Sequence, residues 1–172
     1  QLMRDIRILP VTDASILSQK MAPVIADVHA AGGIEGPSPT PATGTATLVV
    51  EHTADNNLTT FRFKNPGVAM KAAEADFNIA TASGDRTLRA GALIVEHADL
   101  AALGPQLTAL GLSGWVVPTA PAVKTHDLDL PRIGYVHSWT LTQDDDWWRP
   151  ACDAHAVPYT HFADQRLRDG DL

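Results

Sequence analysis

The segments His52–Asp55 and His126–Asp129 each place an aspartate three residues after a histidine. On a helix this spacing puts both side chains on one face, where an imidazole and a carboxylate can share a zinc ion. His52, however, ends a predicted strand, and His126 lies in a proline-rich connection. Ordinary hydrogen-bonding or surface roles are therefore favoured over a metal site. The sequence also lacks paired-cysteine and HExxH patterns, so it contains no strong zinc motif.

A second candidate pair is Cys152 and His155, which lie three residues apart in a predicted helix. A thiol beside an imidazole is the arrangement of a cysteine nucleophile and its general base. A nucleophile in an α/β fold, however, normally sits on a tight turn between a strand and a helix. Because Cys152 lies well inside the helix, the sequence favours a half-buried structural thiol, and a cysteine hydrolase is the alternative.

Polar side chains follow two predicted strands at the point where each strand ends. Residues His52–Asn57 come at the end of one strand, and His97–Asp99 follow another. Ligands of open α/β sheets bind at the carboxyl ends of strands, so both segments are candidates for lining one cleft. The candidate ligand-binding residues are His52, Asp55, Asn56, His97 and Asp99. The alternative is that Asp55 and Asp99 cap the helices that follow them.

The remaining patterns indicate the elements that must position these residues. Apolar and β-branched runs predict strands at 47–52, 68–77, 91–95 and 115–117. Leucines three or four apart follow Asp99 and predict a helix that ends at Gly111. Residues 58–64 fit a helix or a strand, and residues 81–87 are polar and typical of a turn. This alternation predicts a three-layer α/β fold, with a parallel or mixed sheet and helices on both faces.

Composition divides the chain into four parts. Residues 1–45 hold a predicted helix near 13–28 and a Gly/Pro-rich loop, and residues 46–118 form an α/β domain. Proline-rich residues 119–131 are the predicted linker, and residues 132–172 hold a strand, a helix and a second strand. This last unit ends before an α/β layer is complete, which indicates an excised piece of a larger protein. We expect its open sheet edge to be shielded by self-association, as a homodimer.

Charge and composition exclude several classes of function. The chain has 20 acidic and 13 basic residues and a net charge of −7, which argues against a nucleic-acid-binding surface. No apolar run reaches the roughly 18 residues that a membrane span needs. Cys152 is the single cysteine of the sequence, so the chain forms no internal disulfide. The apolar fraction of 45% is typical of a globular core.

Several segments resemble a family of large bacterial proteins in which a zinc carboxypeptidase-like domain precedes regions related to the class I glutamine amidotransferase fold. The matching segments are Val50–Leu58, Thr60–Phe63, Glu74–Phe77, Arg132–Gly134, Ser138–Trp139, Asp144–Trp148 and Val157–Tyr159. The resemblance implies a region downstream of the peptidase domain, with a flavodoxin-like or amidotransferase-like sheet. It also implies a periplasmic or secreted parent protein whose peptidase domain holds zinc.

By this resemblance the chain itself carries no catalytic or metal-binding residue. The peptidase domain of the family holds zinc with an HxxE pair and a distant histidine, and HxxE does not occur in this sequence. The leading hypothesis is a non-catalytic accessory region without a cofactor of its own, whose partner is the peptidase domain of the parent protein. The alternative is a module that binds a peptide or a small molecule at the strand ends near His52–Asn57 and His97–Asp99.

Overall fold

The computed structural model describes residues 10–23, 25, 32–36, 46–82, 84–138 and 143–170, apart from the side chains of 143–146. Near the N-terminus, part of the predicted helix over 13–28 forms a 3₁₀ helix, Ala14–Ser18. Asp13 caps it by accepting a hydrogen bond from the Ser15 N–H at 2.9 Å. The helix ends at Ser18, and much of the stretch that follows lies outside the described residues.

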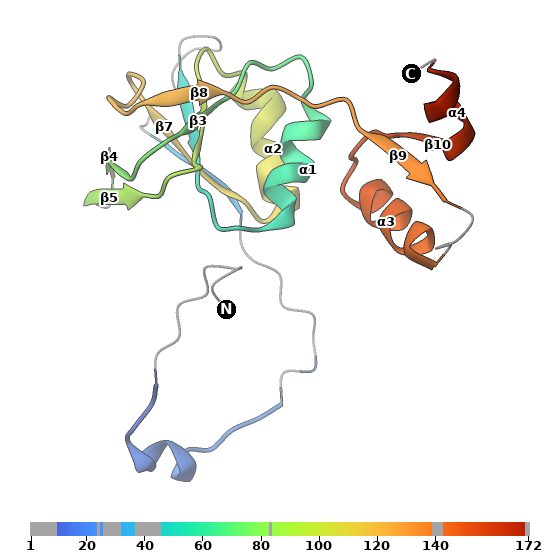
Figure 1. Cartoon of the computed structure of the whole chain (residues 1–172). Helices are drawn as coiled ribbons and strands as arrows, with labels where there is room; N and C mark the ends of the chain where they lie inside the picture. The colour runs from blue at the N-terminus through green and yellow to red at the C-terminus, as the bar shows by residue number, and fades with distance from the viewer. Residues whose placement is uncertain are drawn as a thin grey trace.

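A mixed sheet of six strands forms the centre of the described chain (Figure 1). In spatial order its strands are β1 (Gly33–Glu35), β7 (Ser113–Val117), β2 (Thr47–Val50), β6 (Leu93–Val95), β3 (Lys71–Ala73) and β8 (Thr125–Asp127). The β1–β7 pair is parallel, and the other neighbouring pairs are antiparallel. Strands β2 and β6 are buried at every residue, as expected for apolar strands that are covered on both faces. The predicted α/β class with a mixed sheet is therefore confirmed.

Two helices, α1 (Asn56–Lys64) and α2 (Leu100–Leu110), lie side by side on one face of this sheet (Figure 1). Asp55 begins α1 by accepting a hydrogen bond from the Asn57 N–H at 2.8 Å. Asp99 begins α2 in the same way, and Gly111 ends it in the left-handed conformation at φ 66°. The predicted helix after Asp99 is thus confirmed. The ambiguous segment 58–64 is a helix, because its N-cap outweighs the alternation of Phe61 and Phe63.

The main core lies between these helices and the sheet. Phe61 of α1 and Leu107 of α2 are fully buried there, against Leu48 of β2. The side-chain amides of Asn65, which ends α1, and Gln106, in the second half of α2, join the two helices by hydrogen bonds of 2.9 and 3.2 Å. Burial of large apolar side chains is the dominant stabilising contribution to such a core, so α1 is held firmly enough to position residues on its other side.

The opposite face of the sheet is covered by a hairpin of β4 (Phe77–Thr81) and β5 (Gly84–Leu88), which gives the fold its third layer (Figure 1). Ile79 and Leu88 are buried there with Trp115 of β7. The sequence predicted helices on both faces of the sheet, and on this face the described covering element is the β4–β5 hairpin. The sequence also predicted a turn over 81–87. The turn prediction was wrong because residues 84–87 are an exposed strand whose polar side chains resemble those of a loop.

The sheet extends beyond the range 46–118 that composition assigns to the α/β domain. Strand β1 lies within the predicted Gly/Pro-rich loop and pairs with β7, as Gly33 does with Ser113. Strand β8 lies within the predicted linker and pairs with β3, as His126 does with Ala72. Short strands of three residues leave no periodic pattern in the sequence, so the tertiary pairing alone identifies them.

The C-terminal unit consists of β9 (Gly134–His137), α3 (Gln143–Ala154), β10 (Thr160–Ala163) and α4 (Asp164–Asp169). Strands β9 and β10 are parallel, which confirms the predicted strand–helix–strand unit. A hydrogen bond of 3.0 Å between Thr60 Oγ1 and His155 Nδ1 joins this unit to α1. Among the described residues of 132–170 none is buried. No helix within the described part of the chain is long and apolar enough to span a membrane.

We predict that the two-stranded sheet of the C-terminal unit associates with a second copy of the chain. An isolated pair of strands is at best marginally stable, and open edges template further pairing. The unit also exposes 70% of Trp147 and 61% of Trp148 to solvent, so these side chains are open to an intermolecular contact. Sedimentation velocity over a range of concentrations is expected to show a dimer. A strictly monomeric profile at high concentration would refute this prediction.

Candidate functional site

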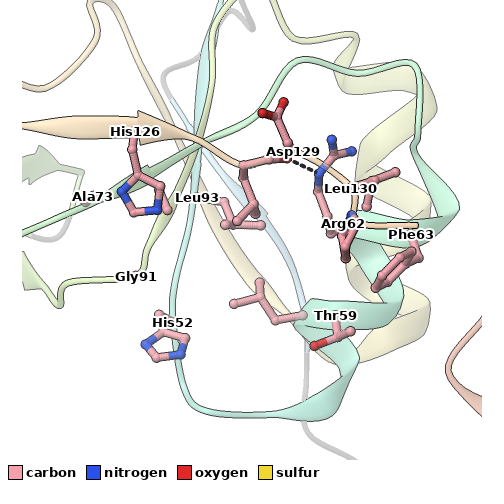
Figure 2. Close-up of a pocket in the computed structure, with 14 residues that line it drawn as sticks. His52, Thr59, Arg62, Phe63, Ala73, Gly91, Leu93, His126, Asp129 and Leu130 are labelled. Carbon is pink, nitrogen blue, oxygen red and sulfur yellow. Dashed lines mark hydrogen bonds between the residues drawn. The ribbon is translucent and has the colours of Figure 1, made fainter. Parts of the chain in front are cut away.

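A concave surface lies beside α1, where the helix, strands β3, β6 and β8 and the connection after β8 meet (Figure 2). We call it the α1 groove. It has a volume of about 460 Å³, within the range of roughly 300–1,000 Å³ that is typical of ligand sites. Its lining residues are His52, Leu58, Thr59, Arg62, Phe63, Ala72, Ala73, Gly91, Leu93, His126, Leu128, Asp129, Leu130 and Pro131. Most of them are apolar, and Leu58, Ala72 and Leu93 also belong to the buried core.

Arg62 is the fixed cation of the α1 groove. Its Nε–H donates to the Leu128 carbonyl at 2.9 Å, and its Nη1 donates to the Asn65 carbonyl at 2.8 Å. The first bond ties α1 to the connection after β8, and the second uses a carbonyl at the end of α1, where a cation is favoured. Within the described part of the chain, no hydrogen bond engages Nη2 of Arg62. A pre-oriented guanidinium with free N–H groups is suited to a carboxylate.

Two histidines, His52 and His126, line the other side of the groove (Figure 2). His52 Nδ1 lies 3.1 Å from the Ala90 carbonyl. Because a carbonyl only accepts, His52 Nδ1 carries the proton, and Nε2 is the acceptor nitrogen of the neutral ring. His126 Nδ1 lies 3.4 Å from Glu74 Oε1, so this ring also directs Nδ1 at an acceptor. In the neutral tautomer with the proton on Nδ1, each ring can accept a hydrogen bond through Nε2.

Glu74 is kept ionised by its basic neighbours. A hydrogen bond from the Lys124 ammonium is the main cause that lowers the pKa of the Glu74 carboxyl, and His126 lowers it further. The resulting carboxylate is an acceptor only, so it orients the His126 ring through Nδ1. Specific partners thus hold Arg62 on one side of the groove and His52 and His126 on the other, with apolar side chains between them.

Gly91 allows the His52 ring to lie against the backbone that leads into β6. A Cβ atom at this position would lie 2.8 Å from His52 Nδ1, and Gly91 has φ +88°, which side chains rarely adopt. The glycine therefore permits the close approach that lets His52 reach the Ala90 carbonyl. The sequence contained this residue at the start of a predicted strand but gave no sign of its contact.

The zinc hypothesis from the two His–Asp pairs finds no support in this geometry. Both histidines line the groove, but Asp55 is occupied as the N-cap of α1 and is not among the lining residues. Asp129 does line the groove, whereas His126 faces Glu74. Among the described residues, no group of three or more His, Cys, Asp or Glu side chains is placed to hold a metal ion.

Comparisons with protein-family models, with curated proteins and with solved structures found no match. The resemblance to a region of carboxypeptidase-like proteins therefore stays a prediction.

The single cleft predicted at two strand ends is not formed. Strand β2 runs antiparallel to β6, with Val50 opposite Leu93, so the carboxyl ends of the two strands lie at opposite ends of the sheet. The Ala98 N–H donates to the Ala46 carbonyl at 2.9 Å, which places the segment after β6 where β2 begins. The prediction of one cleft assumed parallel strands, and the antiparallel pairing overturns it.

The individual residues predicted for that cleft have separate positions. His52 alone lines the α1 groove, and Asn56 is the exposed first residue of α1. His97 is exposed after β6 with φ 55°. Asp99 accepts hydrogen bonds from the Ala101 and Ala102 N–H groups at 3.1 and 3.2 Å. The alternative interpretation of Asp55 and Asp99 as helix caps is therefore confirmed.

The Cys152–His155 pair finds no support as a nucleophile and its base, because no hydrogen bond joins the two side chains within the described part of the chain. Cys152 is half-buried within α3, and His155 follows the end of that helix. The side-chain hydrogen bond of His155 goes to Thr60 on α1. The imidazole thus serves the contact between the C-terminal unit and α1, in agreement with a structural role for this segment.

Arg62, which is held by two backbone carbonyls at the groove, was not predicted from the sequence. Thr59, Arg62 and Phe63 are spaced at i, i+3 and i+4 and share one face of α1, while Leu58 and Phe61 face the core. Only the assignment of 58–64 to a helix reveals this second face. The helical spacing of Thr59, Arg62 and Phe63 could have revealed this face, but only after residues 58–64 had been assigned to a helix and not to a strand.

Proposed function

We propose that this chain is a non-catalytic binding module whose α1 groove takes the C-terminal end of a peptide with an apolar last residue. The observation that carries the proposal is the position of Arg62, which two backbone carbonyls hold at an apolar groove. A terminal carboxylate would pair with the free N–H groups of Arg62. The apolar side chain would then lie against Leu58 and Leu93.

The two histidines support a peptide over a simple apolar acid. The acceptor nitrogens of His52 and His126 suit the N–H donors of a peptide backbone, which a fatty acid lacks. Burial of one apolar side chain contributes about 1.5–3 kcal/mol, and a carboxylate–guanidinium pair adds specificity for the chain end. These contributions are consistent with a weak, selective site rather than a tight one.

The accessory role beside a zinc carboxypeptidase domain is the second candidate function. The position of Arg62 at the groove supports this role. Its guanidinium suits a carboxylate, and a free C-terminal carboxylate is the group that every carboxypeptidase substrate presents. In that role the α1 groove would hold a substrate end near the peptidase domain of the parent protein, and this chain would supply neither zinc nor catalytic residues.

Isothermal titration with a short acetylated peptide that ends in leucine is the test of the proposed function. The free acid is expected to bind, and the C-terminal amide of the same peptide is expected to bind about tenfold more weakly or worse, because it lacks the charge that Arg62 recognises. A matched free acid that ends in aspartate should bind more weakly than leucine, since the groove floor is apolar.

Equal affinities for the acid and the amide would refute recognition of a carboxylate. The same samples should contain no released leucine after prolonged incubation. Release of leucine together with one zinc ion per chain would overturn the non-catalytic interpretation.

A further inference from the structure

Another pocket lies on the hairpin side of the central sheet, where residues of β1, β7 and β4 meet. It has a volume of about 290 Å³, close to the lower end of the roughly 300–1,000 Å³ that is typical of ligand sites, so it suits a small ligand. We call it the Glu35 pocket. Glu35 of β1 is the register partner of Trp115 of β7, so their side chains lie on the same face of the sheet. Trp115 packs with Ile79 of the hairpin on that face, whereas the α1 groove lies on the opposite face.

The carboxylate of Glu35 is held in place by an indole. The Trp115 Nε1–H donates to Glu35 Oε2 at 3.2 Å. Because the Trp115 ring is 4% exposed and packs against the hairpin, this donor is fixed by the core. Within the described part of the chain, Glu35 has no basic partner and its Oε1 accepts no hydrogen bond. Oε1 is therefore the oxygen that is left for a ligand.

The guanidinium of Arg86 lies against the same indole but does not pair with Glu35. Its Cζ is 4.4 Å from the centroid of the Trp115 ring. Its Nη2 donates to both carboxylate oxygens of Glu51, each at 3.0 Å. Arg86 is not among the residues that line the pocket, and Glu35 is the one charged residue among those that do. The pocket therefore has a negative charge that no neighbouring cation compensates.

Apolar groups form the walls of the Glu35 pocket. Ala80 comes from β4, Val116 from β7, and Pro118 follows β7 directly. A Cβ atom on Gly36 would lie 3.0 Å from Val116 Cβ and 3.3 Å from its Cγ2, so the glycine lets the chain after β1 pack closely against Val116. Glu35 itself is exposed. An alkyl chain between these walls would leave water while a charged group at its end stays beside Glu35.

We propose that the Glu35 pocket binds a primary alkylammonium ion, with the ammonium group on Glu35 Oε1 and the alkyl chain against the apolar walls. A guanidinium recognises a carboxylate best through both oxygens, and here the Trp115 indole already occupies Oε2. An ammonium is a compact point charge that can pair with the remaining oxygen. The net charge of −7 also attracts cations to the chain. A lysine side chain and a small free amine share this chemistry.

The test is a titration of the full 172-residue chain with n-butylammonium, in which NMR follows the indole N–H signal of Trp115. This signal reports on Glu35 because the indole donates to its carboxylate. We expect n-butylammonium to shift the signal and added sodium chloride to weaken its binding, since the contact is an ion pair at the surface. n-Butanol and butyrate lack the cation and should bind about fivefold more weakly or worse.

N-acetyl-lysine amide distinguishes the two sources of an alkylammonium group. Binding of this probe as well would assign the site to a lysine side chain, and binding of n-butylammonium alone would assign it to a small free amine. n-Butanol that binds as tightly as n-butylammonium would overturn the proposal, and so would an indole signal that n-butylammonium does not shift.

A variant and a matched control complete the experiment. Glu35→Gln removes the charge but keeps an oxygen that accepts from the Trp115 indole, so the fold should retain its thermal unfolding midpoint. It is expected to weaken n-butylammonium binding about fivefold, as an exposed ion pair allows. Asp129→Asn removes a carboxylate from the α1 groove, on the other face of the sheet, and should bind n-butylammonium as the unaltered chain does. Unaltered affinity in Glu35→Gln would overturn the proposal, whichever way the peptide titration at the α1 groove turns out.

Discussion

Replacing Arg62 with alanine is expected to weaken binding of a leucine-terminated peptide acid by about 10- to 100-fold. Hydrogen bonds to a charged group contribute about 1.5–3 kcal/mol each, and about 1.4 kcal/mol corresponds to a factor of ten in affinity. Arg62 is already held by the carbonyls of Leu128 and Asn65, so a ligand gains its contacts without ordering the side chain. Isothermal titration with the acid and its amide measures the effect. The amide should bind the variant and the unaltered chain about equally.

Two further variants separate recognition from folding. Arg62→Ala also removes two bonds that tie α1 to its surroundings, so its thermal stability must be compared with that of the unaltered chain. Arg62→Lys retains the charge without the planar fork and should give an intermediate affinity. Asp129→Asn removes the negative charge from the rim of the groove and should strengthen binding of the acid. If Asp129→Asn weakens binding instead, the ligand carboxylate does not lie near Arg62.

Local signals in the sequence predicted the elements that are defined by their own residues. Helix α2 has both a capping aspartate, Asp99, and a terminating glycine, Gly111, which act within one turn of the chain. The buried strands β2, β6 and β7 are short apolar runs. In these cases the stabilising interactions are local or depend only on burial, so the sequence pattern is sufficient.

The α1 groove could not be predicted because it depends on pairings between distant segments. His52 and His126 line the same groove only because β8 forms from the proline-rich connection and pairs with β3. The direction of a strand in a sheet also leaves no mark on its own residues. For this reason the antiparallel arrangement of β2 and β6, which separates His52 from His97, was visible only in the structure.

Replacing Phe61 with alanine is expected to lower the free energy of unfolding by about 3–5 kcal/mol, which is the range for truncating a buried phenylalanine. Phe61 is 0% exposed and packs in the core cluster with Leu58, Leu103 and Leu107. Its removal would leave a cavity between α1 and the sheet that the neighbouring strands cannot close. Unfolding in urea, followed by circular dichroism, measures the loss as a lower midpoint with an unchanged slope.

Phe63 provides the matched control, because it lies two residues away on the same helix but only half-buried at the α1 groove. Phe63→Ala should cost less than half as much stability as Phe61→Ala, since it removes less buried surface and opens no internal cavity. It should, however, weaken binding of the leucine-terminated peptide, which Phe61→Ala affects only through folding. An equal loss of stability in both variants would contradict the orientation of α1, and with it the placement of Arg62 at the groove. Phe61→Ala therefore tests the packing of α1 in the core, and Phe63→Ala tests the proposed site on the other face of the same helix.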